Sequence, residues 1–218
     1  MSHNISVFIS VETSYATEAM MHYVKVFMAI AVMSSIHENA FGQSLGYGSC
    51  PNVDALGHFE PEKYTGRWYE IERVISTFHP CGSCVTADYD AEKDSSGKPT
   101  GNILVTETMT NWLGYIKSKS GRAVPLDKST TDAKYVVSFQ GASSNSSYWV
   151  LNTDYSTYSV VYSCTSVWGL YNLKYLWLLA RDPEPSLYVQ QKMQSVLQSK
   201  GLSSYLLFKT NQKNCQYT

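Results

Sequence analysis

The sequence has no run of lysine or arginine, and its 17 basic and 18 acidic residues leave a formal net charge of -1. A balance so close to zero offers no electrostatic footprint for nucleic acid or for an anionic membrane surface. Internal repeats and low-complexity tracts are absent too. The chain has 218 residues, 44% of them hydrophobic, which is enough for one sizeable core. We therefore expect a single-domain protein that does not bind nucleic acid.

A hydrophobic stretch long enough to cross a bilayer as a helix is also missing. The apolar residues 26–33 are too few for that, but they follow a weakly basic segment and precede small residues at two cleavage positions. This layout is typical of a secretory signal peptide, although a short buried helix would also fit it. We interpret residues 1–42 as an upstream extension and signal peptide, with Met20 or Met21 as the initiator, and residues 43–218 as one domain.

The cysteines do not form a complete metal-binding pattern. Cys81 and Cys84 make one CxxC, which in a cytosolic protein would indicate redox chemistry or half of a zinc site. No second CxxC and no pair of histidines at ligand spacing accompanies it, so we predict no metal site. In a secreted protein, five cysteines indicate disulfides with one thiol left over. The five are Cys50, Cys81, Cys84, Cys164 and Cys215.

Short segments rich in β-branched and aromatic residues, separated by clusters of Gly, Asn, Asp and Ser, fill most of the chain after the signal peptide. Such spacing is typical of an antiparallel barrel or sandwich. The predicted strands are residues 66–74, 84–91, 102–109, 112–119, 133–140, 147–153, 157–164 and 173–181. Residues 61–64 form a predicted turn before the first strand. One predicted helix follows at residues 186–198, with Leu187, Met193 and Leu197 as its apolar stripe.

Three separated motifs carry a family resemblance. They are, in order, Gly66-Arg67-Trp68-Tyr69, Thr153-Asp154-Tyr155 and Arg181. Because these motifs have compatible spacing and the cysteines match, the chain resembles the lipocalins, in particular the apolipoprotein D group, over roughly residues 50–215. The resemblance implies an all-β fold, an eight-stranded antiparallel up-and-down barrel (a calyx) with one C-terminal α-helix packed outside. Eight strands followed by a helix is also the order that the sequence pattern predicts, and such a barrel can hold one small ligand.

The resemblance implies structural roles for several residues. Trp68 closes the bottom of the barrel, and Arg181 lies across its ring in a cation-π contact. Two disulfides tie the lead-in and the C-terminal tail to the barrel. The implied pairs are Cys50 with Cys164 and Cys84 with Cys215.

Cys81 is the thiol that this pairing leaves over. Cys81 lies in the first loop between strands, which in lipocalins overhangs the open mouth of the barrel. The apolipoprotein D group has its additional cysteine elsewhere, at the position that Ser166 occupies in this chain. Cys81 could remain a free thiol, exchange places with Cys84, crosslink a partner or attach a bilin. A few lipocalins are isomerases that use a barrel cysteine. His79 is a conceivable partner for Cys81, but a loop position argues against catalysis, and we predict that the protein is not an enzyme.

Inward-facing aromatic and aliphatic side chains are the predicted ligand-binding residues. Tyr89 and Trp177 match ligand-lining positions of the apolipoprotein D group, and strand alternation adds others on the same side. The predicted set is Trp68, Tyr89, Tyr135, Val137, Phe139, Tyr148, Tyr162 and Trp177. Such a pocket suits a flat or elongated hydrophobic molecule, such as a lipid, fatty acid, retinoid or steroid. Bilins and carotenoids are the pigment alternatives, and no cofactor is required.

Two acidic residues complicate this apolar interior. Strict alternation from Trp68 places Glu70 and Glu72 inside the barrel, where an unpaired carboxylate is costly. One explanation is a bend that releases them, or an internal pairing with Arg73 or a lysine. The other is that one carboxylate anchors a polar ligand group, such as a pyrrole N–H. Glu107 raises the same question.

The predicted function is extracellular binding and transport of a small hydrophobic ligand inside the barrel. A peripheral contact with a membrane or a receptor is an additional prediction for the outer surface. The alternation of strand residues does not separate a monomer from a homodimer. Asn145 begins an Asn-Ser-Ser sequon in a polar loop, which predicts glycosylation in a secreted protein.

Overall fold

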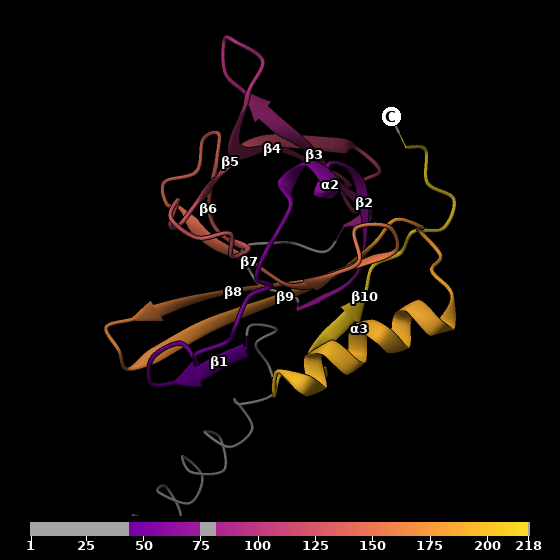
Figure 1. The fold of residues 1–218 in the computed structure, drawn as a ribbon. Helices are drawn as coiled ribbons and strands as arrows, with labels where there is room; N and C mark the ends of the chain where they lie inside the picture. The colour runs from indigo at the N-terminus through magenta and orange to yellow at the C-terminus, as the bar shows by residue number, and fades with distance from the viewer. Residues whose placement is uncertain (1–43, 75–81, 218) are drawn as a thin grey trace, which may run out of the picture. The chain divides into compact units, whose positions relative to one another are not determined.

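The computed structural model describes residues 44–74 and 82–217 and contains, within them, a ten-stranded antiparallel sheet. The sheet runs β1-β9-β8-β7-β6-β5-β4-β3-β2-β10, and β2 pairs with β9 as well, so strands β2 to β9 close into a barrel (Figure 1). The strands are β1 Ser44–Tyr47, β2 Gly66–Val74, β3 Ser83–Lys93, β4 Pro99–Thr110, β5 Ile116–Pro125, β6 Lys134–Phe139, β7 Ser146–Thr153, β8 Tyr158–Val167, β9 Tyr171–Ala180 and β10 Leu207–Lys209. The predicted eight-stranded antiparallel barrel is therefore confirmed.

Two short strands and one short helix were not predicted from the sequence. β1 lies against β9, and β10 lies against the end of β2. The predicted turn at residues 61–64 is the helix α2 (Pro61–Tyr64), which begins with a proline as its first helical residue. These elements are too short to show a period in the sequence, and the two strands form only because a longer strand offers them an edge.

The C-terminal helix α3 (Leu187–Ser199) packs outside the barrel, as predicted. Ser186 caps it, because its side chain accepts a hydrogen bond from the Val189 backbone N–H. Met193 and Leu197 are buried, but Leu187 is 69% exposed and does not belong to the apolar stripe. The prediction for Leu187 was wrong because the packed face of α3 carries Val189, Met193, Val196 and Leu197, and Leu187 lies off that face.

Two hydrophobic clusters lie on opposite sides of the barrel wall. The inner cluster includes Trp68, Tyr89, Tyr135 and Val161 and fills the lower interior. The outer cluster lies between α3 and strands β7 to β9; its larger members are Tyr158, Tyr162, Leu176, Leu178, Met193 and Leu197. Helix α3 thus buries one outer face of the barrel, which would otherwise be exposed to water.

The placement of Tyr162 inside the barrel was wrong. Tyr162 lies opposite Trp149 and Leu176 in the sheet and belongs to the outer cluster under α3. The neighbouring Val161 is the residue of β8 that faces inward. Since α3 buries the outer face, all residues from Tyr158 to Ser163 are buried, and the sequence shows no alternation that would distinguish the two faces.

The fourth predicted strand, residues 112–119, begins too early, because β5 begins at Ile116. The Asn111 side chain accepts backbone hydrogen bonds from Leu113 and Tyr115, so this segment forms the connection between β4 and β5. Gly114 has a φ of +84°, which suits a turn. The apolar residues of this connection resemble a strand in the sequence, but Trp112 is 83% exposed and Tyr115 is 66% exposed.

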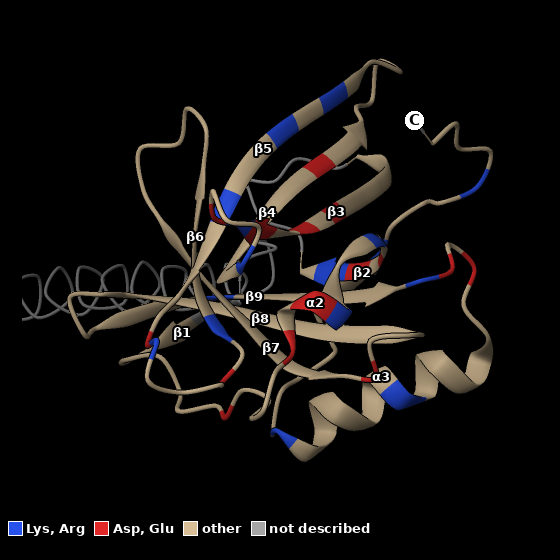
Figure 2. Cartoon of the chain, turned by 45° about the horizontal axis from the view of Figure 1, so that its top comes forward, with Lys and Arg blue, Asp and Glu red and all other residues tan. Residues whose placement is uncertain are grey.

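Charged residues of both signs lie along strands β2 to β5, whereas β7 and β8 carry none and α3 carries only Lys192 (Figure 2). In the described part of the chain, no helix is long and apolar enough to cross a membrane. The predicted signal peptide (residues 1–42), His79 and Cys81 lie outside the described residues.

Candidate ligand-binding site in the barrel

The floor of the barrel is built by residues from three distant segments. The Trp68 side chain is completely buried, and its ring stacks on Tyr64 of α2 at a centroid distance of 5.0 Å. The Arg181 guanidinium carbon lies 3.8 Å from the centroid of the Trp68 ring. Arg181 also donates to the backbone carbonyls of Thr65 (2.8 Å) and Arg67 (2.8 Å). Arg181 therefore fastens the α2–β2 junction beneath Trp68, as the family motif implied.

The second motif forms the turn between β7 and β8. The Asp154 carboxylate accepts backbone hydrogen bonds from Ser156, Thr157 and Tyr158. Burial opposes ionisation of Asp154, but these bonds and the Thr157 hydroxyl outweigh it, so the pKa of the carboxyl lies below its ordinary value. Tyr155, with a φ of 65°, carries its carbonyl to within 3.0 Å of Arg181 Nε. This turn is a structural part of the barrel floor.

A chain of hydroxyl groups runs through the lower interior. Tyr64 Oη lies 2.8 Å from Ser159 Oγ and 3.1 Å from Tyr148 Oη, and Tyr148 Oη lies 2.7 Å from Tyr89 Oη. Burial raises the pKa of Tyr64 to about 12 and raises the pKa values of Tyr89 and Tyr148 well above the ordinary value. The phenols are therefore neutral hydrogen-bonding groups at neutral pH, and they satisfy one another.

The remaining predicted lining residues fall into two groups. Tyr89, Tyr135 and Val137 are at most 6% exposed and belong to the packed inner cluster, like Trp68. Phe139, Tyr148 and Trp177 pack against that cluster but keep part of their surface exposed. The latter three are therefore the predicted lining residues that are not fully buried.

Glu70 and Glu72 point to opposite sides of the barrel wall. The pairing of β2 with β9 shifts between them, because Ile71 is an extra residue with no partner in the register. Glu70 is 5% exposed and lies opposite Leu179 of the inner cluster, whereas Glu72 lies opposite Leu178 of the outer cluster. The bulge therefore releases Glu72 from the interior, so strict alternation was wrong at that residue.

Glu70 remains inside and is paired there. Its Oε1 lies 3.4 Å from Arg73 Nε and accepts a hydrogen bond from Thr210 Oγ1 at 2.5 Å. Burial raises the pKa of the Glu70 carboxyl, and Arg73 and Thr210 oppose that rise. The internal pairing with Arg73 that the sequence suggested is present.

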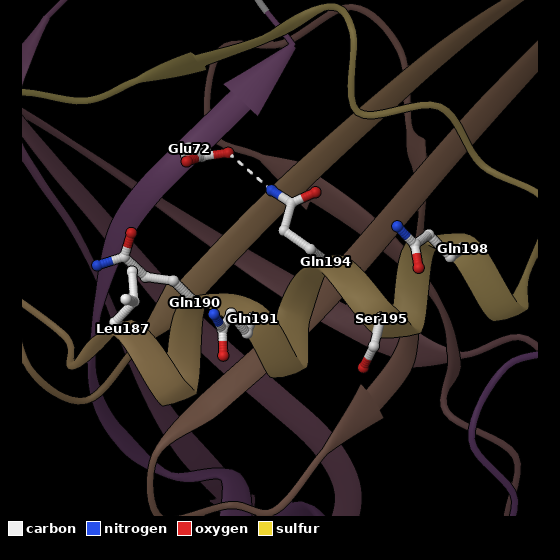
Figure 3. A pocket seen from close by; sticks show the side chains of 7 residues that line it. All are labelled: Glu72, Leu187, Gln190, Gln191, Gln194, Ser195 and Gln198. Atoms are coloured by element: carbon white, nitrogen blue, oxygen red, sulfur yellow. Dashed lines mark hydrogen bonds between the residues drawn. The ribbon is translucent and has the colours of Figure 1, made fainter.

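Glu72 contributes to a pocket on the outside of the barrel, beside α3 (Figure 3). The pocket has a volume of about 370 Å³, and Gln194 Nε2 donates to Glu72 Oε2 across it at 3.2 Å. Besides these two and Leu187, its lining consists of Gln190, Gln191, Ser195 and Gln198. These residues supply amide, hydroxyl and carboxylate groups but none of the aromatic rings that the sequence predicts for the ligand site.

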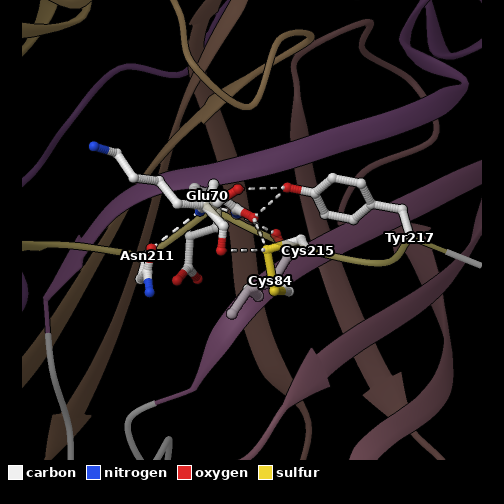
Figure 4. Close-up of a disulfide and its surroundings, with 8 residues drawn as sticks. Glu70, Cys84, Asn211, Cys215 and Tyr217 are labelled. Carbon is white, nitrogen blue, oxygen red and sulfur yellow. Dashed lines mark hydrogen bonds between the residues drawn. A yellow bond between two sulfur atoms is a disulfide. The ribbon is translucent and has the colours of Figure 1, made fainter.

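The C-terminal tail is attached next to Glu70. A disulfide joins Cys84 to Cys215, and Gln212 Nε2 donates to the carbonyls of Glu70 and Val85, both at 2.8 Å (Figure 4). The Tyr217 hydroxyl bonds to Gln212 in turn. The other disulfide joins Cys50 to Cys164. Both predicted pairs are confirmed, and they fit an extracellular protein.

A second ion pair lies on the inner face, between β4 and β5. Glu107 and Lys119 are direct cross-strand neighbours, and Lys119 Nζ lies 2.7 Å from Glu107 Oε2. The same ammonium group lies 4.2 Å from the centroid of the Phe139 ring. Unlike the Glu70 pair, these two side chains are partly exposed, 33% for Glu107 and 39% for Lys119.

Sequence reasoning missed Tyr64, Ser159 and Lys119. Lys119 had a usable signal, since it alternates with Gly121 and Ala123 on one face of β5, but the predicted strand ended at residue 119. Tyr64 had none, because a single helical turn brings it under the barrel. Among the described residues, no group of three or more His, Cys, Asp or Glu side chains could hold a metal ion.

The family follows from comparison with known proteins. The model of the lipocalin-like domain matches residues 59–212, from the segment before α2 to the C-terminal tail. The chain belongs to the lipocalin family. Bovine (Bos taurus) apolipoprotein D is 32% identical to this lipocalin over 192 residues, covering 88% of this chain and 97% of the bovine protein.

More distant relatives of this lipocalin agree with that assignment. The Lazarillo protein of Schistocerca americana is 29% identical over 166 residues, covering 75% of this chain and 74% of that protein. Among solved structures, insecticyanin from the tobacco hornworm Manduca sexta has a TM-score of 0.70 at 21% identity, covering 81% of this chain and 94% of insecticyanin. At that identity, the likeness to insecticyanin establishes the shared fold.

Proposed function

We propose that this lipocalin is a secreted carrier that binds one small hydrophobic ligand inside its barrel. One observation carries the proposal: in a closed barrel, three aromatic residues that are not fully buried, Phe139, Tyr148 and Trp177, pack against the aromatic inner cluster. Burying a ligand's apolar surface against these rings would supply about 25 cal/mol per Å². The two disulfides, the predicted signal peptide and the predicted glycosylation of exposed Asn145 support secretion.

Native mass spectrometry of protein purified from its source without organic solvent would test this function. We expect a bound hydrophobic mass at a ratio of one per chain. The matched variants are Trp177→Ala, which removes a partly exposed inner ring, and Trp168→Ala, which removes a 90% exposed ring outside the inner cluster. The first should weaken ligand binding at least severalfold, and the second should leave it unchanged. Equal affinity in both variants would remove Trp177 from the site.

A pigment ligand, a bilin or a carotenoid, is the second candidate. The fold shared with insecticyanin supports a barrel of comparable shape, and flat conjugated molecules match the aromatic rings of the interior. Visible absorbance that follows the protein through purification would favour a pigment, and its absence would favour a colourless lipid. Absorbance that survives denaturation would indicate attachment to the chain and would implicate Cys81.

The proposed carrier performs no chemistry. Cys84 is bound in a disulfide, so it does not supply the thiolate that a cysteine isomerase needs. A peripheral membrane or receptor contact, in a monomer or a homodimer, stays part of the proposal. The exposed Trp112, Leu113, Tyr115 and Ile116 at the β4–β5 connection support such a contact.

A further inference from the structure

The inner face of the barrel carries charges that a purely hydrophobic ligand does not need. In the described strands, Glu70, Arg73, Glu107 and Lys119 are the buried or partly buried charges of this face, and we call these four residues the inner charge cluster; Lys117, on the same face, is exposed at the rim. Figure 2 shows basic bands along β5 and one acidic band on the neighbouring β4, where Glu107 is the only acidic residue. The cluster holds two carboxylates and two cations, so its formal net charge is zero.

The sheet register places this cluster directly beside the aromatic floor. Trp68 lies opposite Ala87, Ala87 opposite Glu107, and Glu107 opposite Lys119, so one inward row crosses β2, β3, β4 and β5. Glu70 follows Trp68 by two residues toward the mouth. A ligand that rests on Trp68 therefore has Glu107 and Lys119 in the same inward row as the ring beneath it.

Within the cluster, Glu107 and Lys119 are the accessible members. Glu70 and Arg73 are 6% and 8% exposed in their side chains, whereas Glu107 and Lys119 are 33% and 39% exposed. Phe139 is held beneath the ammonium group, because Gly121 leaves room for its ring: a Cβ at Gly121 would lie 2.7 Å from Phe139 Cδ1. The pair is thus fixed in place beside an apolar ring and can be reached from the interior.

The balance of charge decides which polar group fits there. A ligand carboxylate would add a third negative charge beside the two existing cations, and it would face Glu107 as a like charge. A hydroxyl group can donate to the Glu107 carboxylate and accept from the Lys119 ammonium without adding charge. The apolar remainder of the molecule would then lie on Phe139 and the floor.

We propose that the Glu107–Lys119 pair selects a neutral, hydroxyl-bearing amphiphile, such as a long-chain alcohol, over a carboxylate of the same chain length. This inference rests on the proposed binding function and names the class of ligand for that same site. Lys117 lies on the same face two residues closer to the mouth, but it is exposed to solvent, so its charge is screened.

Three ligands that share one twelve-carbon chain would test the selectivity: dodecanol, laurate and methyl laurate. Their dissociation constants would be measured at pH 7.5, below micelle formation, by displacement of a fluorescent fatty probe. We expect dodecanol to bind about tenfold more tightly than laurate, which corresponds to about 1.4 kcal/mol. Methyl laurate lacks the donor and should bind severalfold more weakly than dodecanol. Equal affinities, or tighter binding of laurate, would overturn the proposal.

Charge variants with matched controls give a second, independent readout. Glu107→Gln leaves the cluster with a net charge of +1 and should reverse the preference toward laurate, whereas Lys119→Gln should increase the preference for dodecanol. The controls are Glu92→Gln, which breaks a pair with Arg122 on the outer face, and Lys117→Gln at the exposed rim. Neither control should change the ratio of the two affinities by more than about twofold. If Lys117→Gln changes the ratio of the dodecanol and laurate affinities and Lys119→Gln does not, the assignment to Lys119 is wrong.

Failure of the selectivity and failure of the carrier function give different results. If no variant and no ligand displaces the probe, or the probe itself does not bind, the proposed function is wrong. If all three ligands bind but the ratio is unaffected by Glu107→Gln and Lys119→Gln, the carrier function stands and the role of the pair is wrong. Because the wild-type comparison needs no variant, a Glu107→Gln protein that does not fold leaves the test intact.

Discussion

At the scale of single residues, Trp68 shows how one side chain connects otherwise separate parts. Its indole Nε1 donates to the Tyr64 carbonyl at 2.9 Å, its ring stacks on Tyr64, and Arg181 covers the other side. The ring therefore joins α2, β2 and the segment after β9. No neighbour can fill the space if the ring is removed, since α2 is a single turn anchored by the same contacts.

We expect Trp68→Ala to lower the free energy of unfolding by about 3 to 5 kcal/mol, the usual cost of truncating a buried aromatic residue. Chemical denaturation would measure the loss. The control is Trp168→Ala, whose ring is 90% exposed and should cost little. A loss below about 1 kcal/mol for Trp68→Ala would show that the floor is held by Arg181 and α2 without the indole.

Glu92 allows a test of pH dependence at one residue. Hydrogen bonds from Arg122, then from Asn102, lower the pKa of Glu92 from 4.5 to about 2. A lowered pKa means that the folded state favours the carboxylate, so this contribution to stability is present above about pH 4.5 and is lost as the pH falls toward about 2. Glu92→Gln should therefore have a lower melting temperature than the wild type at neutral pH, and the difference should shrink through that range. A difference that is constant with pH would contradict the lowered pKa.

At the scale of elements, the bulge in β2 and the cover provided by α3 decide which side chains face the interior. Ile71 shifts the register, so Glu72 faces the outside and Arg73 faces the inside. Helix α3 in turn allows the outer face of β8 to be apolar, and Tyr162 is buried there against it. The bulge changes which residues of β2 face inward. The cover by α3 makes both faces of β8 apolar, so alternation no longer distinguishes them.

Tyr162→Phe tests the outer cluster. In the described part of the chain, the buried Tyr162 hydroxyl has no hydrogen-bond partner. Removing it should stabilise the protein by about 1 kcal/mol, because an unsatisfied buried polar group is lost. Leu197→Ala, in the same cluster, should destabilise by about 2 to 5 kcal/mol. Ligand affinity should stay unchanged in both, and a clear loss of affinity in Tyr162→Phe would place that residue back in the barrel interior.

At the scale of the whole molecule, two disulfides restrain the ends of the chain. They link residues 114 and 131 positions apart, and in the chain-entropy model each long loop contributes on the order of 4 to 5 kcal/mol. The Cys84–Cys215 bond holds the tail that supplies Thr210 and Gln212 to the surroundings of Glu70.

Replacing one disulfide at a time tests these restraints. Cys84→Ala with Cys215→Ala should lower the melting temperature and also weaken binding, because Glu70 loses its neighbours in the tail. Cys50→Ala with Cys164→Ala should lower the melting temperature alone, since this bond lies away from the inner charge cluster. Thermal unfolding and ligand titration would separate the two effects. An unchanged melt in the first variant would show that hydrogen bonds hold the tail without the disulfide.

Much of the fold was predictable because it depends on local and periodic properties. The strand Gly66–Val74 has the bounds predicted for it, and the helix boundaries differ by one residue at each end, since alternation, turn residues and caps act over a few positions. The motifs around Trp68, Asp154 and Arg181, with their family resemblance, were enough for the barrel and the disulfide pairs.

The amino-acid sequence by itself therefore determined the strand order and the helix, and the family resemblance of its motifs implied the closing tryptophan and the pairing of the cysteines. Only the tertiary structure decided which face of β8 lies inside and where Glu72 points, because a covering helix and a single extra residue act through contacts between distant segments. It also decided that Lys119 meets Glu107: a cross-strand pair depends on the register of two strands, and that register is set by the closed sheet rather than by either strand alone.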